Sequence, residues 1–140
     1  MLGDGSEKPK AIKIRHTMIR VANLEKSISF YTRKLGMEVM RRRESQERGE
    51  KVAYVGFGDE ERHHALELVE MMDPPAEYLH GNTYGHVALL VTSVEKISRI
   101  LKEQGVEFAL DPHHVRPENP NMLAFIKDPD GYEIELTERR

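Results

Sequence analysis

Two histidines and two glutamates recur at matched places in the sequence, and together they could bind a divalent metal ion. Glu67 follows His16 after 51 residues, and Glu135 follows His86 after 49. Two imidazole nitrogens and two carboxylate oxygens suit a borderline divalent ion and leave room for water. The chain has no cysteine, which argues against a structural zinc site, and open water positions are typical of a catalytic one. We therefore predict these four residues as metal ligands.

The matched spacing arises from an internal duplication of the chain. The segment that begins at Arg15 aligns with the one that begins at Gly85, so that His16 falls on His86, 70 residues later. Residues 52–55 fall on 123–126 with an offset of 71, and residues 66–68 fall on 134–136 with an offset of 68. An ordinary amphipathic strand with glutamate facing water would explain each glutamate alone, but not the paired histidines.

Each copy predicts one strand, one helix and three further strands. The helices are expected between Asn23 and Gly36 and between Ser93 and Gly105, with an N-cap residue before each apolar stripe and a glycine after it. This βαβββ order predicts an α+β fold of two tandem modules that form a curved, mixed sheet around the metal site. The expected strands are 12–21, 37–42, 51–57 and 64–70 in the first copy, and 86–91, 106–110, 122–127 and 132–137 in the second.

Arg20 is a further candidate for the site. It lies four residues after His16 on one strand, so both side chains should share a face. A guanidinium beside a metal pocket could bind a carboxylate or a phosphate, and the alternative is an exposed strand charge. The remaining histidines are predicted to be loop residues, although the pair His113-His114 could touch a ligand. These loop histidines are His63, His64, His80, His113 and His114.

Composition excludes several classes of protein. With 21 basic and 24 acidic residues the net charge is −3, so the concentrated basic surface of a nucleic-acid-binding protein is not expected. No apolar run approaches the roughly 20 residues of a membrane span, and the first ten residues lack the apolar centre of a secretory signal. We expect a cytoplasmic protein with a disordered tail over 1–10 and a single domain over 11–140, made of modules 11–72 and 83–138.

The motifs resemble those of the glyoxalase I (lactoylglutathione lyase) family in the vicinal-oxygen-chelate superfamily. The resemblance covers residues 12–138. It is carried by His16-Thr-Met-Ile-Arg-Val21, Ser27-Ile-Ser-Phe-Tyr31, Lys34-Leu-Gly-Met37, Ala53-Tyr-Val-Gly-Phe-Gly58, Leu66-Glu-Leu68, Thr83-Tyr-Gly-His86 and Leu123-Ala-Phe-Ile-Lys-Asp-Pro-Asp-Gly-Tyr-Glu-Ile-Glu-Leu136.

The resemblance implies a function and an assembly. The reaction would convert the hemithioacetal of methylglyoxal and glutathione to S-lactoylglutathione, a detoxification of methylglyoxal. The family's metal ligands match His16, Glu67, His86 and Glu135. The resemblance implies that Glu135 is the base and that Glu67 can act on the opposite enantiomer of the substrate. Arg20 matches the arginine that binds a glutathione carboxylate. The resemblance also implies a homodimer with shared metal sites, and nickel as the ion, with cobalt, manganese and zinc as alternatives.

The sequence also departs from the family, and other functions fit parts of it. Met71 stands where the family often has an asparagine that contacts glutathione. The segment 111–121 replaces a stretch that helps to bind the glycyl carboxylate, and Arg116 is a candidate substitute. The related dioxygenases and thiol transferases use two histidines and one glutamate, and the epimerases usually have glutamine at the position of Glu67. A ligand-binding member without metal usually lacks these ligands.

Overall fold

The computed structural model describes residues 8–139. Residues 1–7 of the expected tail, and Arg140, lie outside the described residues. Residues 8–15 form no regular secondary structure and are exposed. The first strand therefore begins at His16, the first residue that pairs with its neighbouring strand, rather than at residue 12.

The βαβββ order predicted for each copy is confirmed. The first module contains β1 (His16–Arg20), α1 (Leu24–Ser29), the π-helical turn η1 (Phe30–Lys34), β2 (Glu38–Ser45), β3 (Glu50–Gly56) and β4 (Ala65–Met71). The second contains β5 (His86–Leu90), α2 (Val94–Glu103), β6 (Phe108–His114), β7 (Met122–Lys127) and β8 (Glu133–Thr137). In residues 8–139 no helix is both long and apolar enough to cross a membrane.

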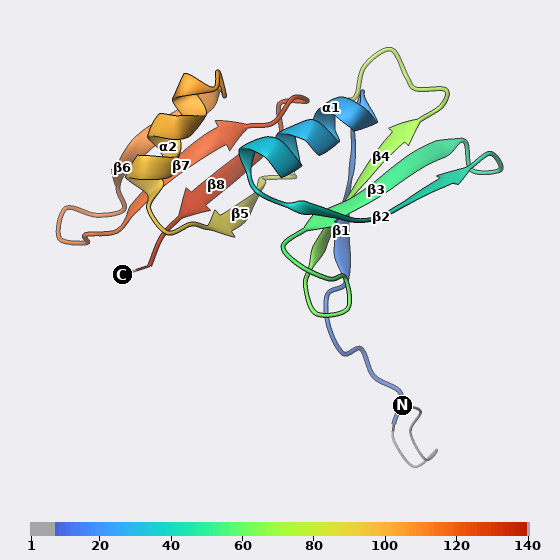
Figure 1. Cartoon of the computed structure of the whole chain (residues 1–140), viewed down its shortest axis with the longest axis horizontal. Coiled ribbons are helices and arrows are strands. Elements are labelled where there is room, and N and C mark those ends of the chain that lie inside the picture. The colour runs from blue at the N-terminus through green and yellow to red at the C-terminus, as the bar shows by residue number, and fades with distance from the viewer. Residues whose placement is uncertain (1–7, 140) are drawn as a thin grey trace.

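Each module forms its own mixed sheet of four strands. The strand orders are β1-β4-β3-β2 and β5-β8-β7-β6, so the two sheets have the same topology (Figure 1). In each sheet the first strand runs parallel to the last, and the other pairs are antiparallel. Within the described residues, strand pairing stays inside each module, so the expected curved mixed sheet is built as two sheets.

The helix ends follow the sequence signals. The Asn23 and Ser93 side chains each accept a hydrogen bond from the backbone N–H three residues later, at 3.0 and 3.2 Å. Such contacts satisfy one of the free N–H groups of a first helical turn. Gly36 and Gly105 have φ of 77° and 80°, a left-handed conformation that glycine adopts without a steric cost.

The first helix differs from the expectation of one regular helix between Asn23 and Gly36. The α-helix ends at Ser29, and the chain continues as the π-helical turn η1. The Thr32 hydroxyl donates to the Ile28 carbonyl at 2.7 Å, and such back-bonding competes with the regular helical ladder. The apolar stripe still lies on the buried face, since Tyr31 and Leu35 are buried.

The prediction of His113 and His114 as loop residues is wrong, because both belong to β6. The misleading signal was Pro112, which lacks a backbone N–H and usually marks a loop. β6 is an edge strand, and an edge strand tolerates proline on its unpaired side. Its pairing with β7 is irregular between Leu110 and His113.

One hydrophobic core joins the two modules. It contains buried residues of both, including Leu68 from β4 and Leu136 from β8. Polar contacts cross the same seam. The Tyr31 hydroxyl donates to the Asp128 carboxylate at 2.7 Å, and the Tyr132 hydroxyl donates to the Arg20 carbonyl at 2.7 Å. The seam therefore combines apolar packing with buried hydrogen bonds.

We expect Tyr31→Phe to destabilise the protein. Tyr31 is only 1% exposed, and burial raises the pKa of its hydroxyl as well as that of Asp128. Removing the hydroxyl leaves a buried carboxylate oxygen without this donor, which should cost about 1–3 kcal/mol of the free energy of unfolding. Urea denaturation measures the loss.

Tyr78→Phe is the matched control, because the Tyr78 hydroxyl is buried without a hydrogen-bond partner among the described residues. The same chemical change should there alter the free energy of unfolding little. Equal losses in the two variants would contradict a stabilising role for the Tyr31–Asp128 hydrogen bond.

Candidate metal centre

The first histidine–glutamate pair comes together on the sheet of the first module. β1 and β4 are parallel neighbours, and Met18 pairs with Glu67, so His16 lies one side-chain repeat away on the same face. His16 Nε2 and Glu67 Oε1 are 3.2 Å apart. Their side chains are 31% and 10% exposed, so solvent reaches the imidazole of the pair more than the carboxylate.

The second pair repeats this geometry on the other sheet. β5 and β8 are parallel neighbours, and Ala88 pairs with Glu135. His86 Nε2 and Glu135 Oε1 are 3.4 Å apart, with side chains 40% and 21% exposed. The internal duplication therefore brings each predicted histidine next to its predicted glutamate. The role of the four as metal ligands stays a prediction.

The two pairs do not meet within one chain. In residues 8–139 no group of three or more histidine, aspartate or glutamate side chains lies close enough to bind one ion. One pair comes from β1 and β4 and the other from β5 and β8, and these strands belong to two separate sheets (Figure 1). Residues 8–139 therefore contain two separate pairs, one of His16 and Glu67 and one of His86 and Glu135, which we call half-sites after their predicted role.

The geometry of each half-site fits two ligands of one ion. Two atoms bonded to an ion at about 2.1 Å lie about 3.0 Å apart at a right angle and about 3.4 Å apart in a tetrahedral arrangement. The observed separations of 3.2 and 3.4 Å match this range. In addition, His16 Nδ1 is buried and has no hydrogen-bond partner among the described residues.

Two residues that the sequence did not suggest contact Glu67. The Tyr54 hydroxyl donates to Glu67 Oε2 at 2.8 Å, and Arg43 Nη2 donates to the same oxygen at 3.0 Å. Hydrogen bonds to Tyr54 and to the carboxylates of Glu50 and Glu67 raise the pKa of the Arg43 guanidinium. The internal repeat could have indicated Tyr54, because this residue aligns with an aromatic residue of the second copy.

Arg20 lies where the sequence predicts, on the His16 face of β1. Its side chain is 38% exposed, and its Nη1 is 3.9 Å from Glu50 Oε2. Glu50 also pairs with Arg43 at 3.1 Å, so one carboxylate lies between two guanidinium groups. Arg20 is therefore loosely held and accessible to an anionic ligand.

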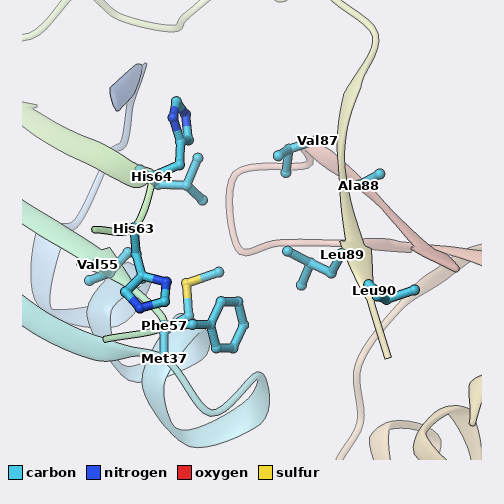
Figure 2. Close-up of a pocket in the computed structure, with 11 residues that line it drawn as sticks. Met37, Val55, Phe57, His63, His64, Val87, Ala88, Leu89 and Leu90 are labelled. Atoms are coloured by element: carbon cyan, nitrogen blue, oxygen red, sulfur yellow. The ribbon is translucent and has the colours of Figure 1, made fainter. Parts of the chain in front are cut away.

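A cavity of about 330 Å³ lies elsewhere, at the seam between the modules. Figure 2 shows Val87, Leu89 and Leu90 of β5 on one side of it and His63 and Phe57 of the first module on the other. None of the four predicted ligands lines this cavity. The half-sites are open sheet faces, so the cavity does not belong to the candidate metal centre.

Comparison with known proteins identifies the family of the chain. The profile of the Glyoxalase/Bleomycin resistance protein/Dioxygenase superfamily matches residues 13–136. The chain belongs to this superfamily. A probable lactoylglutathione lyase of Vibrio cholerae is 38% identical over 128 residues, which cover 91% of each chain. The lactoylglutathione lyase of Neisseria meningitidis is 37% identical over 129 residues, which cover 92% of each.

Solved structures of superfamily members have the same fold. Glyoxalase I from Zea mays superposes with a TM-score of 0.84 at 31% identity, covering 91% of this chain and 44% of the maize chain. This chain therefore spans less than half of the maize protein. A glyoxalase I of Leishmania major, described as trypanothione-dependent, gives a TM-score of 0.78 at 34% identity and covers 91% and 87% of the two chains. The predicted α+β fold of this superfamily is confirmed.

Proposed function

We propose that the protein is a lactoylglutathione lyase, a glyoxalase I that isomerises the hemithioacetal of methylglyoxal and glutathione to S-lactoylglutathione. The observation that carries this conclusion is the duplicated half-site, with one histidine and one glutamate 3.2 and 3.4 Å apart on equivalent strands. Two histidines and two glutamates distinguish this chain from relatives that use a single glutamate. The relatives named lactoylglutathione lyase support the same reaction.

His16, Glu67, His86 and Glu135 would hold the divalent ion. When bound, the ion supplies Lewis acidity toward the substrate oxygens and so makes the neighbouring carbon-bound proton easier to remove. Oxygen and nitrogen ligands without sulfur suit nickel, with cobalt, manganese and zinc as alternatives. The resemblance to the compact bacterial form favours nickel.

Glu135 acts as the base that moves the proton. Its carboxylate takes the proton from the carbon that bears sulfur and returns it to the adjacent carbon. The hydroxyl proton passes between the two substrate oxygens, so the product has the same atoms as the substrate. Glu67, on the opposite half-site, can act as the base for the other enantiomer of the hemithioacetal.

The functional unit is a homodimer with shared metal sites. The pair His16 and Glu67 of one chain would face the pair His86 and Glu135 of its partner. The separation of the two half-sites within one chain supports this arrangement. Each chain contributes modules 11–72 and 83–138 as one domain over 11–140, and the absence of cysteine agrees with a cytoplasmic location.

The thiol half of the substrate binds through Arg20, and Arg20→Ala tests this role. Loss of a charge-assisted contact of about 1.5–3 kcal/mol should lower kcat/KM on the order of 10- to 150-fold. The contact lies away from the reacting carbon, so the loss should appear mainly in KM. Steady-state kinetics with the glutathione hemithioacetal measures it.

Arg42→Ala is the matched control, because Arg42 pairs with Glu25 on the helix at 2.7 Å. Its kcat/KM should change little. An unchanged kcat/KM in Arg20→Ala would remove Arg20 from thiol binding. Failure of the wild-type protein to form the thioester with glutathione, after loading with nickel, cobalt, manganese or zinc, would overturn the proposed reaction. Activity with a different thiol would then show that glutathione is not the thiol of this enzyme.

A further inference from the structure

The two half-sites differ at one aromatic position. Tyr54 and Phe125 are equivalent in the duplication, 71 residues apart. Each is directly paired with a predicted ligand, Tyr54 with Glu67 and Phe125 with Glu135. The Tyr54 hydroxyl donates to Glu67 at 2.8 Å, whereas phenylalanine cannot donate. The ring contact itself is shared, because Phe125 packs edge-on against His86 with ring centroids 4.9 Å apart and Tyr54 packs edge-on against His16 at 5.4 Å.

The Glu67 carboxylate is held on both sides. Its Oε1 faces His16 Nε2, and its Oε2 accepts hydrogen bonds from Tyr54 and Arg43, which come from β3 and β2. Tyr54 is itself fixed, because the guanidinium of Arg41 lies 3.7 Å above the centre of its ring. Charge-assisted hydrogen bonds of this kind are about twice as strong as neutral ones.

The Glu135 carboxylate lacks this support. Among residues 8–139, its polar side-chain contact is with His86, whose Nε2 lies 3.4 Å from Glu135 Oε1. Arg43 pairs opposite Val52, which corresponds to Leu123 in the second copy, and the residue opposite Leu123 is His113 of β6. The His113 Nδ1 lies 3.1 Å from the Asp111 carbonyl oxygen. Among the described residues of the second module, no donor reaches Glu135 as Arg43 reaches Glu67. Glu135 is also the more exposed of the two glutamates, 21% against 10%.

We propose that Tyr54, assisted by Arg43, is a positioning residue that holds Glu67 as a fixed ligand and leaves proton transfer to Glu135. The inference rests on the proposed glyoxalase reaction. To take a proton from carbon, a ligand carboxylate must turn toward the substrate. Glu67 can turn only by breaking two charge-assisted hydrogen bonds, whereas Glu135 has none of this kind with residues 8–139. This restraint would make Glu67 a poor base for the other enantiomer of the hemithioacetal, so the duplication produced one static and one mobile carboxylate.

The decisive test is a gain of activity. Glu135→Gln should retain little activity, because Glu67 is held in place. Adding Tyr54→Phe should release Glu67 and raise that residual kcat on the order of tenfold, the size of one hydrogen bond to a charged group. A merely structural role of Tyr54 would lower the activity further. In the matched control, Tyr54→Phe added to Glu67→Gln should give no gain, since the carboxylate that Tyr54 restrains is absent.

A second readout does not depend on activity. The single variant Tyr54→Phe should release bound nickel to a chelator faster than the wild-type protein, also on the order of tenfold, because its ligand is less restrained. Phe125→Tyr should release it more slowly and should lower kcat with little change in KM.

The proposal is overturned if the double variant of Tyr54 and Glu135 is no more active than Glu135→Gln while both retain metal. Unchanged nickel release in Tyr54→Phe would overturn it as well. The proposed function fails separately, and only if the wild-type protein does not convert the glutathione hemithioacetal. The two failures are therefore distinguishable.

Discussion

Dimers that combine two inactive chains, one with His16→Ala and one with Glu135→Gln, are expected to regain about half of the wild-type activity per dimer. Each substitution damages a different half-site. If every site takes one half from each chain, a mixed dimer has one site with both lesions and one intact site. The two half-sites of a chain do not form one cluster in the described residues, which is the reason to expect sharing.

The experiment requires pure mixed dimers. Co-expression with two different affinity tags and two purification steps isolates them, and thioester formation measures their activity. The matched control combines His16→Ala with Glu67→Gln, two lesions in the same half-site. Every site of that dimer is damaged, so it should stay inactive. A mixed dimer that forms but shows no activity in the first combination would instead favour sites built within single chains.

His86→Ala is expected to lose the metal ion and, with it, nearly all activity. The wild-type protein should bind about one ion per chain when four protein ligands are shared between half-sites. Mutation of a residue that hydrogen-bonds to a metal ligand typically costs 10- to 100-fold in metal affinity. Loss of a direct ligand should therefore cost on the order of 100-fold or more. Metal analysis of the purified protein, together with circular dichroism, separates metal loss from unfolding.

His63→Ala is the control for this variant, since His63 lies in the loop before β4 and lines the seam cavity. It should keep its metal. Treatment of the wild-type protein with a chelator should abolish activity, and added nickel should restore it. Full metal occupancy in His86→Ala would contradict the assignment of His86 as a ligand.

Much of the fold was predictable because its signals are local. The Asn23 and Ser93 caps, and the glycines that end the two helices, act within a few residues of their own position. Strand alternation likewise placed Glu67 between two buried leucines without knowledge of its neighbours. The π-helical turn and the extension of β6 through Pro112 were missed, because there a side-chain hydrogen bond and an edge position override the local signal.

The sequence by itself determined the composition of each half-site. Duplication of a βαβββ unit places corresponding positions on equivalent strands, so the pairing of His16 with Glu67 indicated that of His86 with Glu135. Alternation then indicated which face of each strand they share. Both arguments depend only on spacing along the chain.

Only the tertiary structure decided what surrounds these pairs. A spacing rule indicates the face of a strand but not which strand lies beside it, and the order β1-β4-β3-β2 is set by packing over the whole module. That order places Tyr54 opposite Glu67 and brings Arg43 from β2 onto the same carboxylate. The separation of the two half-sites has the same origin, because each sheet completes its own hydrogen bonding and leaves its histidine–glutamate pair on an open face.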